Sequence, residues 1–60
     1  MSLIKSWYTV DEAAAKYGLS PSQIYAWVED GLVRAEGEKG MISQVNGDDI
    51  ERELLMTASV

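Results

Sequence analysis

The amino-acid sequence predicts a mainly α-helical domain of three helices with one small β-hairpin. Two short segments with helical apolar periodicity are each preceded by a capping residue and followed by a glycine. Two strand-like segments then flank a Gly-Glu-Lys-Gly turn, and a further capping residue opens a third helical segment. The length of 60 residues allows one domain, so we expect a single domain over residues 1–60 with its core at about residues 7–55.

The first helix is expected to follow Thr9. Thr9 is a good N-cap, and Glu12 lies three residues later, which is the spacing of a capping box. Trp7 and Tyr8 are placed at the opening of this helix, where they would cover the small core. Gly18 is predicted to end the helix in the left-handed conformation. The buried face would be formed by Val10, Ala13, Ala14 and Tyr17.

The second helix is expected to begin almost at once. Ser20 is its predicted N-cap, Pro21 suits the first helical position, and Gln23 supplies a second capping box. Leu19 would fill the core from the turn, and Gly31 is the stop signal. Two short helices joined by a tight Gly-Leu-Ser turn are the signature of a helix-turn-helix. The apolar face of the second helix would consist of Ile24, Trp27 and Val28.

After Gly31 the pattern changes to that of a β-hairpin, which in this context would be a wing. Residues 32–36 are interpreted as a strand, residues 37–40 as the turn, and residues 41–45 as the return strand.

The third helix is predicted from its first turn. Asn46 is the expected N-cap, with Asp49 at the third helical position. Ile50 and Leu54 would share its apolar face, and residues 56–60 are expected to fray.

The composition argues against an enzyme. The chain has no cysteine and no histidine, so it lacks thiolate ligands, the commonest metal ligand and the commonest general base. The acidic residues near the third helix do not have the spacing of a calcium loop. We therefore expect no catalytic residue, cofactor, metal or small-molecule ligand. No apolar run approaches the ~20 residues that span a bilayer, so we expect a cytoplasmic protein without a membrane partner.

The order of these elements resembles the excisionase-like and MerR-like winged helix-turn-helix families. The resemblance extends roughly from Trp7 to Leu55 and is carried by residues 8–14, 18–27, 30–33 and 45–50. It implies binding of double-stranded DNA, with the second helix in the major groove and the wing along the backbone. It also implies a set of candidate DNA-contacting residues, namely Ser20, Ser22, Gln23, Tyr25, Ala26, Arg34 and Lys39.

Each candidate has an expected role under this resemblance. Ser20 and Ser22 would lie at a helix N-terminus, which attracts phosphate, although capping is a sufficient structural role for Ser20. Gln23 could read the edge of an adenine. Tyr25 and Ala26 are expected on the exposed side of the helix, and Arg34 and Lys39 could reach phosphates.

The charge of the chain favours an alternative. The net charge is −5, with only five basic residues, whereas DNA binding usually draws on many phosphate contacts. Many members of the resembled families are basic where this chain has Ala26 and in the wing, which here reads Glu-Gly-Glu-Lys. The alternative is a protein-interaction module that has kept the fold and lost the DNA surface. DNA binding would require several basic residues on the side of Ser22 and Tyr25: Lys39, Arg34, and either Lys5 or Lys16.

Overall fold

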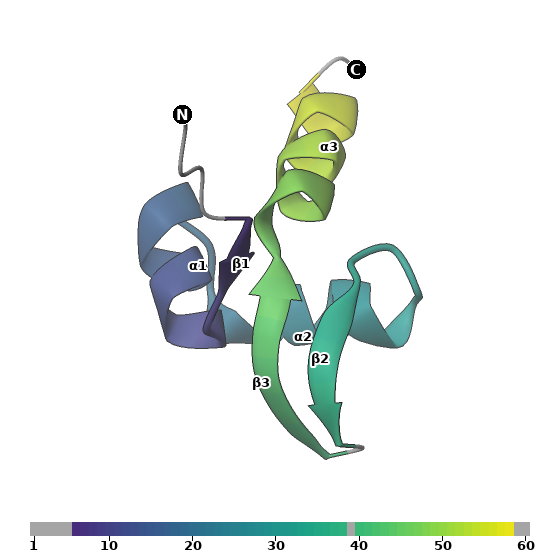
Figure 1. The fold of residues 1–60 in the computed structure, drawn as a ribbon. Coiled ribbons are helices and arrows are strands. Elements are labelled where there is room, and N and C mark those ends of the chain that lie inside the picture. Colours follow the sequence, from purple (N-terminus) through teal and green to yellow (C-terminus); the bar gives the residue numbers. More distant parts are fainter. Residues whose placement is uncertain (1–5, 39, 59–60) are drawn as a thin grey trace, which may run out of the picture.

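The computed structural model describes residues 6–38 and 40–58, and over these residues it has three helices and a three-stranded antiparallel sheet (Figure 1). The mainly helical fold with a wing is therefore confirmed. The elements follow in the order β1 (Trp7–Tyr8), α1 (Val10–Tyr17), α2 (Pro21–Glu29), β2 (Ala35–Glu38), β3 (Met41–Asn46) and α3 (Gly47–Ala58).

The sheet has one strand more than the expected hairpin. Its order is β1-β3-β2, so β3 is central and pairs Trp7 with Asn46 and Tyr8 with Val45. The expectation that Trp7 and Tyr8 open the first helix was wrong, because they form β1. The Gly47 N–H donates to the Ser6 carbonyl at 2.7 Å, which extends this pairing to the start of α3.

The first strand of the hairpin begins later than expected. The prediction of a strand over residues 32–36 was wrong in its start, because β2 spans Ala35–Glu38. The N–H groups of Leu32 and Val33 donate to the Trp27 carbonyl at 2.9 and 3.3 Å, so these residues finish the turn after α2. The Arg34 N–H donates to a side chain of α3 rather than to the sheet.

Gly37 belongs to β2, although the sequence placed it in the turn. The register between β2 and β3 shifts between Glu36 and Gly37, which marks a β-bulge. Gly37 has φ +126°, and a Cβ there would collide with the backbone of Met41 and Ser43. Only glycine therefore fits this point of the wing.

The predicted capping box is complete at the start of α1 but not at the start of α2. Thr9 and Glu12 form the full predicted capping box, with hydrogen bonds of 3.0 and 3.1 Å in the two directions. At α2 the Ser20 Oγ accepts from the Gln23 N–H at 3.2 Å, but no return bond from the Gln23 side chain occurs among the described residues. The second box is therefore only half formed. Gly18 ends α1 at φ +67°, as expected.

The third helix begins as expected and runs further. The Asn46 Oδ1 accepts from the Asp49 N–H at 2.9 Å, which confirms the N-cap. The expected fraying was wrong for residues 56–58, which are helical, while residues 59–60 lie outside the described part of the chain. The Thr57 hydroxyl donates back to the carbonyl of Glu53 at 2.8 Å and supports this last turn.

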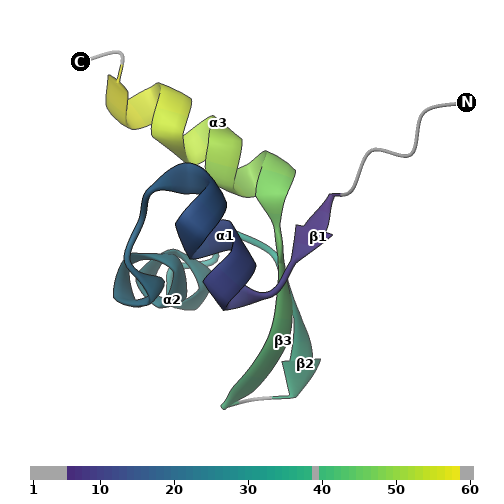
Figure 2. The same cartoon turned by 90° about the vertical axis from the view of Figure 1, so that its left-hand side faces the viewer.

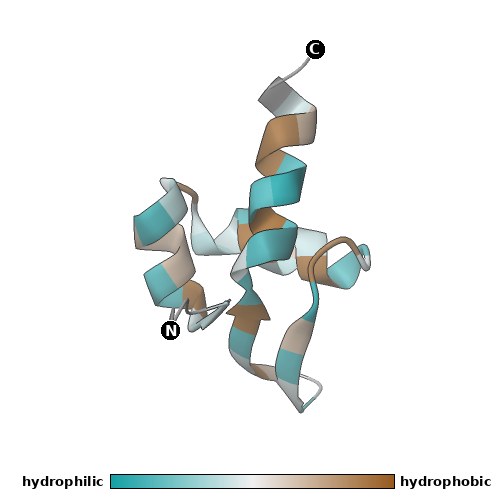
Figure 3. Ribbon diagram, turned by 45° about the horizontal axis from the view of Figure 1, so that its top comes forward, coloured by the Kyte–Doolittle hydropathy of each residue, from teal (hydrophilic) through white to brown (hydrophobic). Residues whose placement is uncertain are grey.

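The core lies where both helices of the helix-turn-helix meet β3 and α3, and the hairpin projects away from it (Figures 1 and 2). Figure 3 shows apolar and polar residues alternating along α3, as expected for a helix with one face on this core. No helix in the described ranges is long and apolar enough to cross a membrane. The buried hydrophobic residues are Val10, Ala13, Ile24, Val33, Val45 and Ile50, and the buried polar side chains are those of Asn46 and Asp49.

Candidate nucleic-acid interface

The outward face of α2 carries uncharged side chains over residues 22–26, and the exposed Glu29 follows in its last turn. Ile24 is fully buried, whereas Ser22, Gln23, Tyr25 and Ala26 are exposed, with Tyr25 at 44%. The sequence placed Tyr25 and Ala26 on this side, and the structure confirms that placement. The face is therefore polar and accessible without being basic.

At the N-terminus of α2 the Gln23 N–H is hydrogen-bonded and the Ser22 N–H is free. The Ser20 hydroxyl is occupied as the N-cap acceptor for the Gln23 N–H, which is the structural role that the sequence also predicted for it. Pro21 has no N–H, and the Ser22 N–H makes no hydrogen bond to any residue of the described ranges. A free N–H at a helix N-terminus is a suitable donor for an anion.

Arg34 lies just before β2 and is paired with Asp49 of α3. Its Nε donates to the Asp49 Oδ2 at 2.8 Å, and its Nη2 donates to Oδ1 at 3.3 Å. The Arg34 side chain is still 70% exposed, whereas that of Asp49 is only 5% exposed. The outer side of the guanidinium is thus open to solvent, but Asp49 offsets part of its charge.

Asp49 accepts more hydrogen bonds than the sequence indicated. It accepts from the Arg34 N–H at 3.0 Å and from Arg52 Nη2 at 3.1 Å, in addition to the Arg34 guanidinium. The hydrogen bonds from the Arg34 side chain hold the pKa of the Asp49 carboxyl below its usual value, against the opposite effect of burial. Sequence reasoning assigned Asp49 only to the helix start, because the pairing with a residue 15 positions away has no local signal.

The basic residues of the described ranges do not gather on α2. Lys16 lies 5.7 Å from the ring centre of Tyr8 and 5.5 Å from that of Tyr17. The Tyr17 hydroxyl donates to Glu51 of α3 at 2.8 Å, so Lys16 belongs to the side of the molecule where α1 meets α3. Arg34 and Arg52 are both paired with Asp49. The candidate residue Lys39, and also Lys5, lie outside the described residues.

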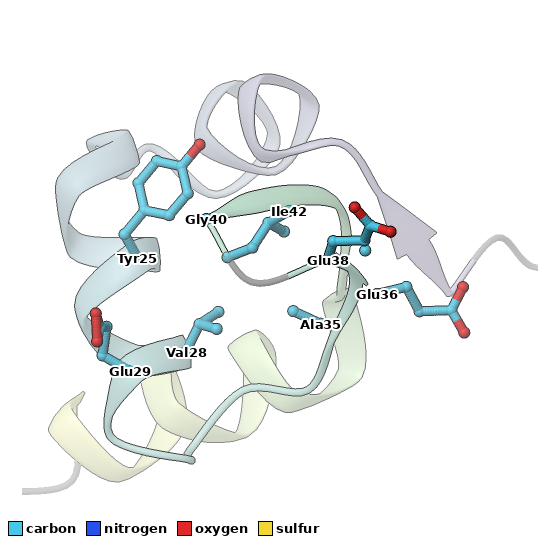
Figure 4. Close-up of a pocket in the computed structure, with 9 residues that line it drawn as sticks. Tyr25, Val28, Glu29, Ala35, Glu36, Glu38, Gly40 and Ile42 are labelled. Carbon is cyan, nitrogen blue, oxygen red and sulfur yellow. The ribbon is translucent and has the colours of Figure 1, made fainter.

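A groove of about 480 Å³ separates α2 from the hairpin (Figure 4). The groove was not foreseen from the sequence. The apolar or small residues that line it are Tyr25, Val28, Ala35, Gly37, Gly40 and Ile42, and the charged ones are Glu29, Glu36 and Glu38.

The described residues contain no group of three or more acidic side chains placed to hold a metal ion. The described residues form two surfaces suited to contact and hydrogen bonding: the polar outward face of α2, and the groove beside it.

Comparison with known proteins identifies a family for this chain. The family model for a helix-turn-helix domain matches residues 7–52, which include β1, both helices of the helix-turn-helix, the wing and the start of α3. No curated protein and no solved structure matches the chain.

Proposed function

Since the chain belongs to the helix-turn-helix domain family, we propose that it binds double-stranded DNA through α2, as a small excisionase-like or transcription-regulatory protein. The observation that carries this proposal is the match over residues 7–52 together with the exposed, polar outward face of α2. Such a helix is the element that enters the major groove in this class of domain.

The proposed contacts divide into positioning and reading. The Ser22 N–H and hydroxyl, with Ser20 beside them, would bind a phosphate at the start of α2. The exposed amide of Gln23 would read a base edge, for which adenine is the usual partner. Tyr25 and Ala26 would contact the wall of the DNA major groove.

The proposed phosphate contacts are few. The solvent-exposed side of the Arg34 guanidinium could reach a phosphate, but Asp49 already offsets part of its charge. Lys39 is the second candidate of this kind and follows Glu36 and Glu38 in the sequence. With about two such contacts, the logarithm of the binding constant would fall by only about two for each tenfold rise in salt. Binding would therefore be weak, and most of the affinity would come from contacts within the major groove of the DNA.

The test is an NMR titration of the labelled chain with a mixed-sequence duplex, at low salt and again at about 150 mM salt. We expect amide shifts at Ser20, Ser22, Gln23 and Tyr25 that shrink as salt rises. The absence of shifts at low salt would contradict the proposal.

Base reading is tested separately by selecting bound duplexes from a randomised pool. The Gln23→Ala variant should lose preference at one position, where a bidentate contact discriminates by about 1–3 kcal/mol. Thr57→Ala, which changes an exposed polar side chain at the far end of α3, should select the same sequences as the wild type. An unchanged selection by Gln23→Ala would exclude Gln23 as a reading residue.

A further inference from the structure

The groove between α2 and the β2–β3 hairpin has an apolar floor. Val28 comes from α2, Ala35 from β2 and Ile42 from β3, and each is half-buried against the edge of the core. Figure 4 shows these three side chains directed into the space between the helix and the hairpin, with the Tyr25 ring beside them. The groove stays open because the hairpin contributes small residues to its lining, namely Ala35, Gly37 and Gly40.

The groove is large enough to admit a large side chain. Its volume of about 480 Å³ lies in the range of pockets that bind small ligands, and it is bordered mainly by carbon. One large apolar side chain of a partner would bury surface against Val28 and Ile42 and also cover part of the exposed Tyr25 ring.

The margin of the groove is acidic. Glu29, Glu36 and Glu38 line it, and Figure 4 shows their carboxylates around the apolar side chains, with Glu36 directed outward. None of the lining residues within the described part of the chain is basic. Glu29 also occupies the last turn of α2, where the helix dipole adds negative potential. This combination repels a phosphate backbone and attracts a cation.

We infer that this groove binds a cationic segment of a protein partner, in which one large apolar side chain is flanked by lysines or arginines. The apolar side chain occupies the floor, and the flanking cations pair with Glu29 and Glu38. This site adjoins the proposed DNA face and shares Tyr25 with it, but it does not depend on DNA binding.

The test uses three synthetic hexapeptides with blocked ends, titrated into the labelled chain. The first has one leucine between lysines, the second has glycine in place of the leucine, and the third has glutamines in place of the lysines. The first peptide should shift the amides of Val28, Ala35 and Ile42, and the other two should bind at least about fivefold more weakly. Equal binding of the glycine peptide would overturn the proposal, because the attraction would then be to charge alone.

Charge-matched variants locate the site. Each exposed ion pair contributes up to about fivefold in affinity, so the double variant Glu29→Gln, Glu38→Gln should weaken the first peptide by about fivefold or more. The control Asp48→Asn, Glu53→Gln changes the net charge equally on α3 and should change binding by less than about twofold. Equal weakening by the two variants, or the absence of any groove shift in the wild type, would overturn the proposal.

A mixed-sequence duplex serves as the third arm at low salt. Shifts at Ser22 and Gln23 without shifts at Val28 and Ile42 would show that the duplex does not occupy the groove. This result would support separate binding sites for DNA and for the peptide. Shifts of Val28 and Ile42 with the duplex, without any with the lysine peptide, would assign the groove to nucleic acid and overturn the proposal. A failure of the duplex to bind at all, with the first peptide bound, contradicts only the proposed DNA function.

Discussion

Asp49 joins the residue that precedes the wing to the start of α3, and its replacement by alanine should destabilise the whole domain. The Arg34 N–H would lose its acceptor at 3.0 Å, and an N–H left without a partner costs about 1–3 kcal/mol. The guanidinium of Arg52 is 64% exposed and recovers most of its loss by hydration. The better helix propensity of alanine returns about 0.5 kcal/mol. We therefore expect a loss of about 2 kcal/mol in the free energy of unfolding.

The measurement is thermal and urea unfolding, followed by circular dichroism. A domain of this length has a total stability of about 3–9 kcal/mol, so the loss should lower Tm by about 10 °C. Asp48→Ala is the matched control, because Asp48 is exposed in the same helical turn and carries the same charge. It should cost less than about 1 kcal/mol. Equal effects of the two variants would refute the argument that hydrogen bonding to the buried carboxylate stabilises the fold.

The same contact predicts a pH dependence. Because the pKa of Asp49 is lowered in the folded state, its contribution is present above the unfolded-state value of about 3.9 and is lost as the pH falls through the lower folded-state pKa. The difference between the wild type and Asp49→Ala should therefore shrink in acid. A difference that stays constant down to pH ~2 would contradict the assigned pKa direction.

Two further substitutions test the packing and capping of the helix starts. Gly47→Ala should lower stability by about 1 kcal/mol despite the helix propensity of alanine, because the new Cβ would lie 2.5 Å from the Tyr8 ring and 2.9 Å from the Tyr17 hydroxyl; a rise in Tm would show that the rings move aside freely. Ser20→Ala should cost about 1 kcal/mol in urea unfolding through loss of the cap on α2, whereas Ser22→Ala should cost much less, and equal costs would contradict the capping role.

The helices could be predicted because their signals are local. Thr9, Gly18, Ser20 and Asn46 each act within three residues of the helix end that they cap, so the sequence window contains the whole interaction. β1 could not be predicted in this way. Two residues carry no periodicity, and their partners in β3 are distant in the chain.

The start of β2 and the groove could not be predicted from the sequence, for a related reason. Residues 32–34 have the composition of a strand, but their N–H groups are taken by Trp27 and by Asp49, which only the tertiary arrangement brings near. The exposed face of α2 followed from helical phase and was predicted correctly. The groove beside it depends on how far the hairpin stands from the helix, which no residue spacing encodes.

The antiparallel pairing of β1 with β3 also bears on how the chain folds. Trp7 pairs with Asn46, so this contact closes a loop that contains α1, α2 and the hairpin. The entropy lost on closing such a loop is recovered only once the enclosed elements have packed. We therefore expect β1 to join the sheet late in folding, and removal of residues 6–8 to speed unfolding more than it slows folding.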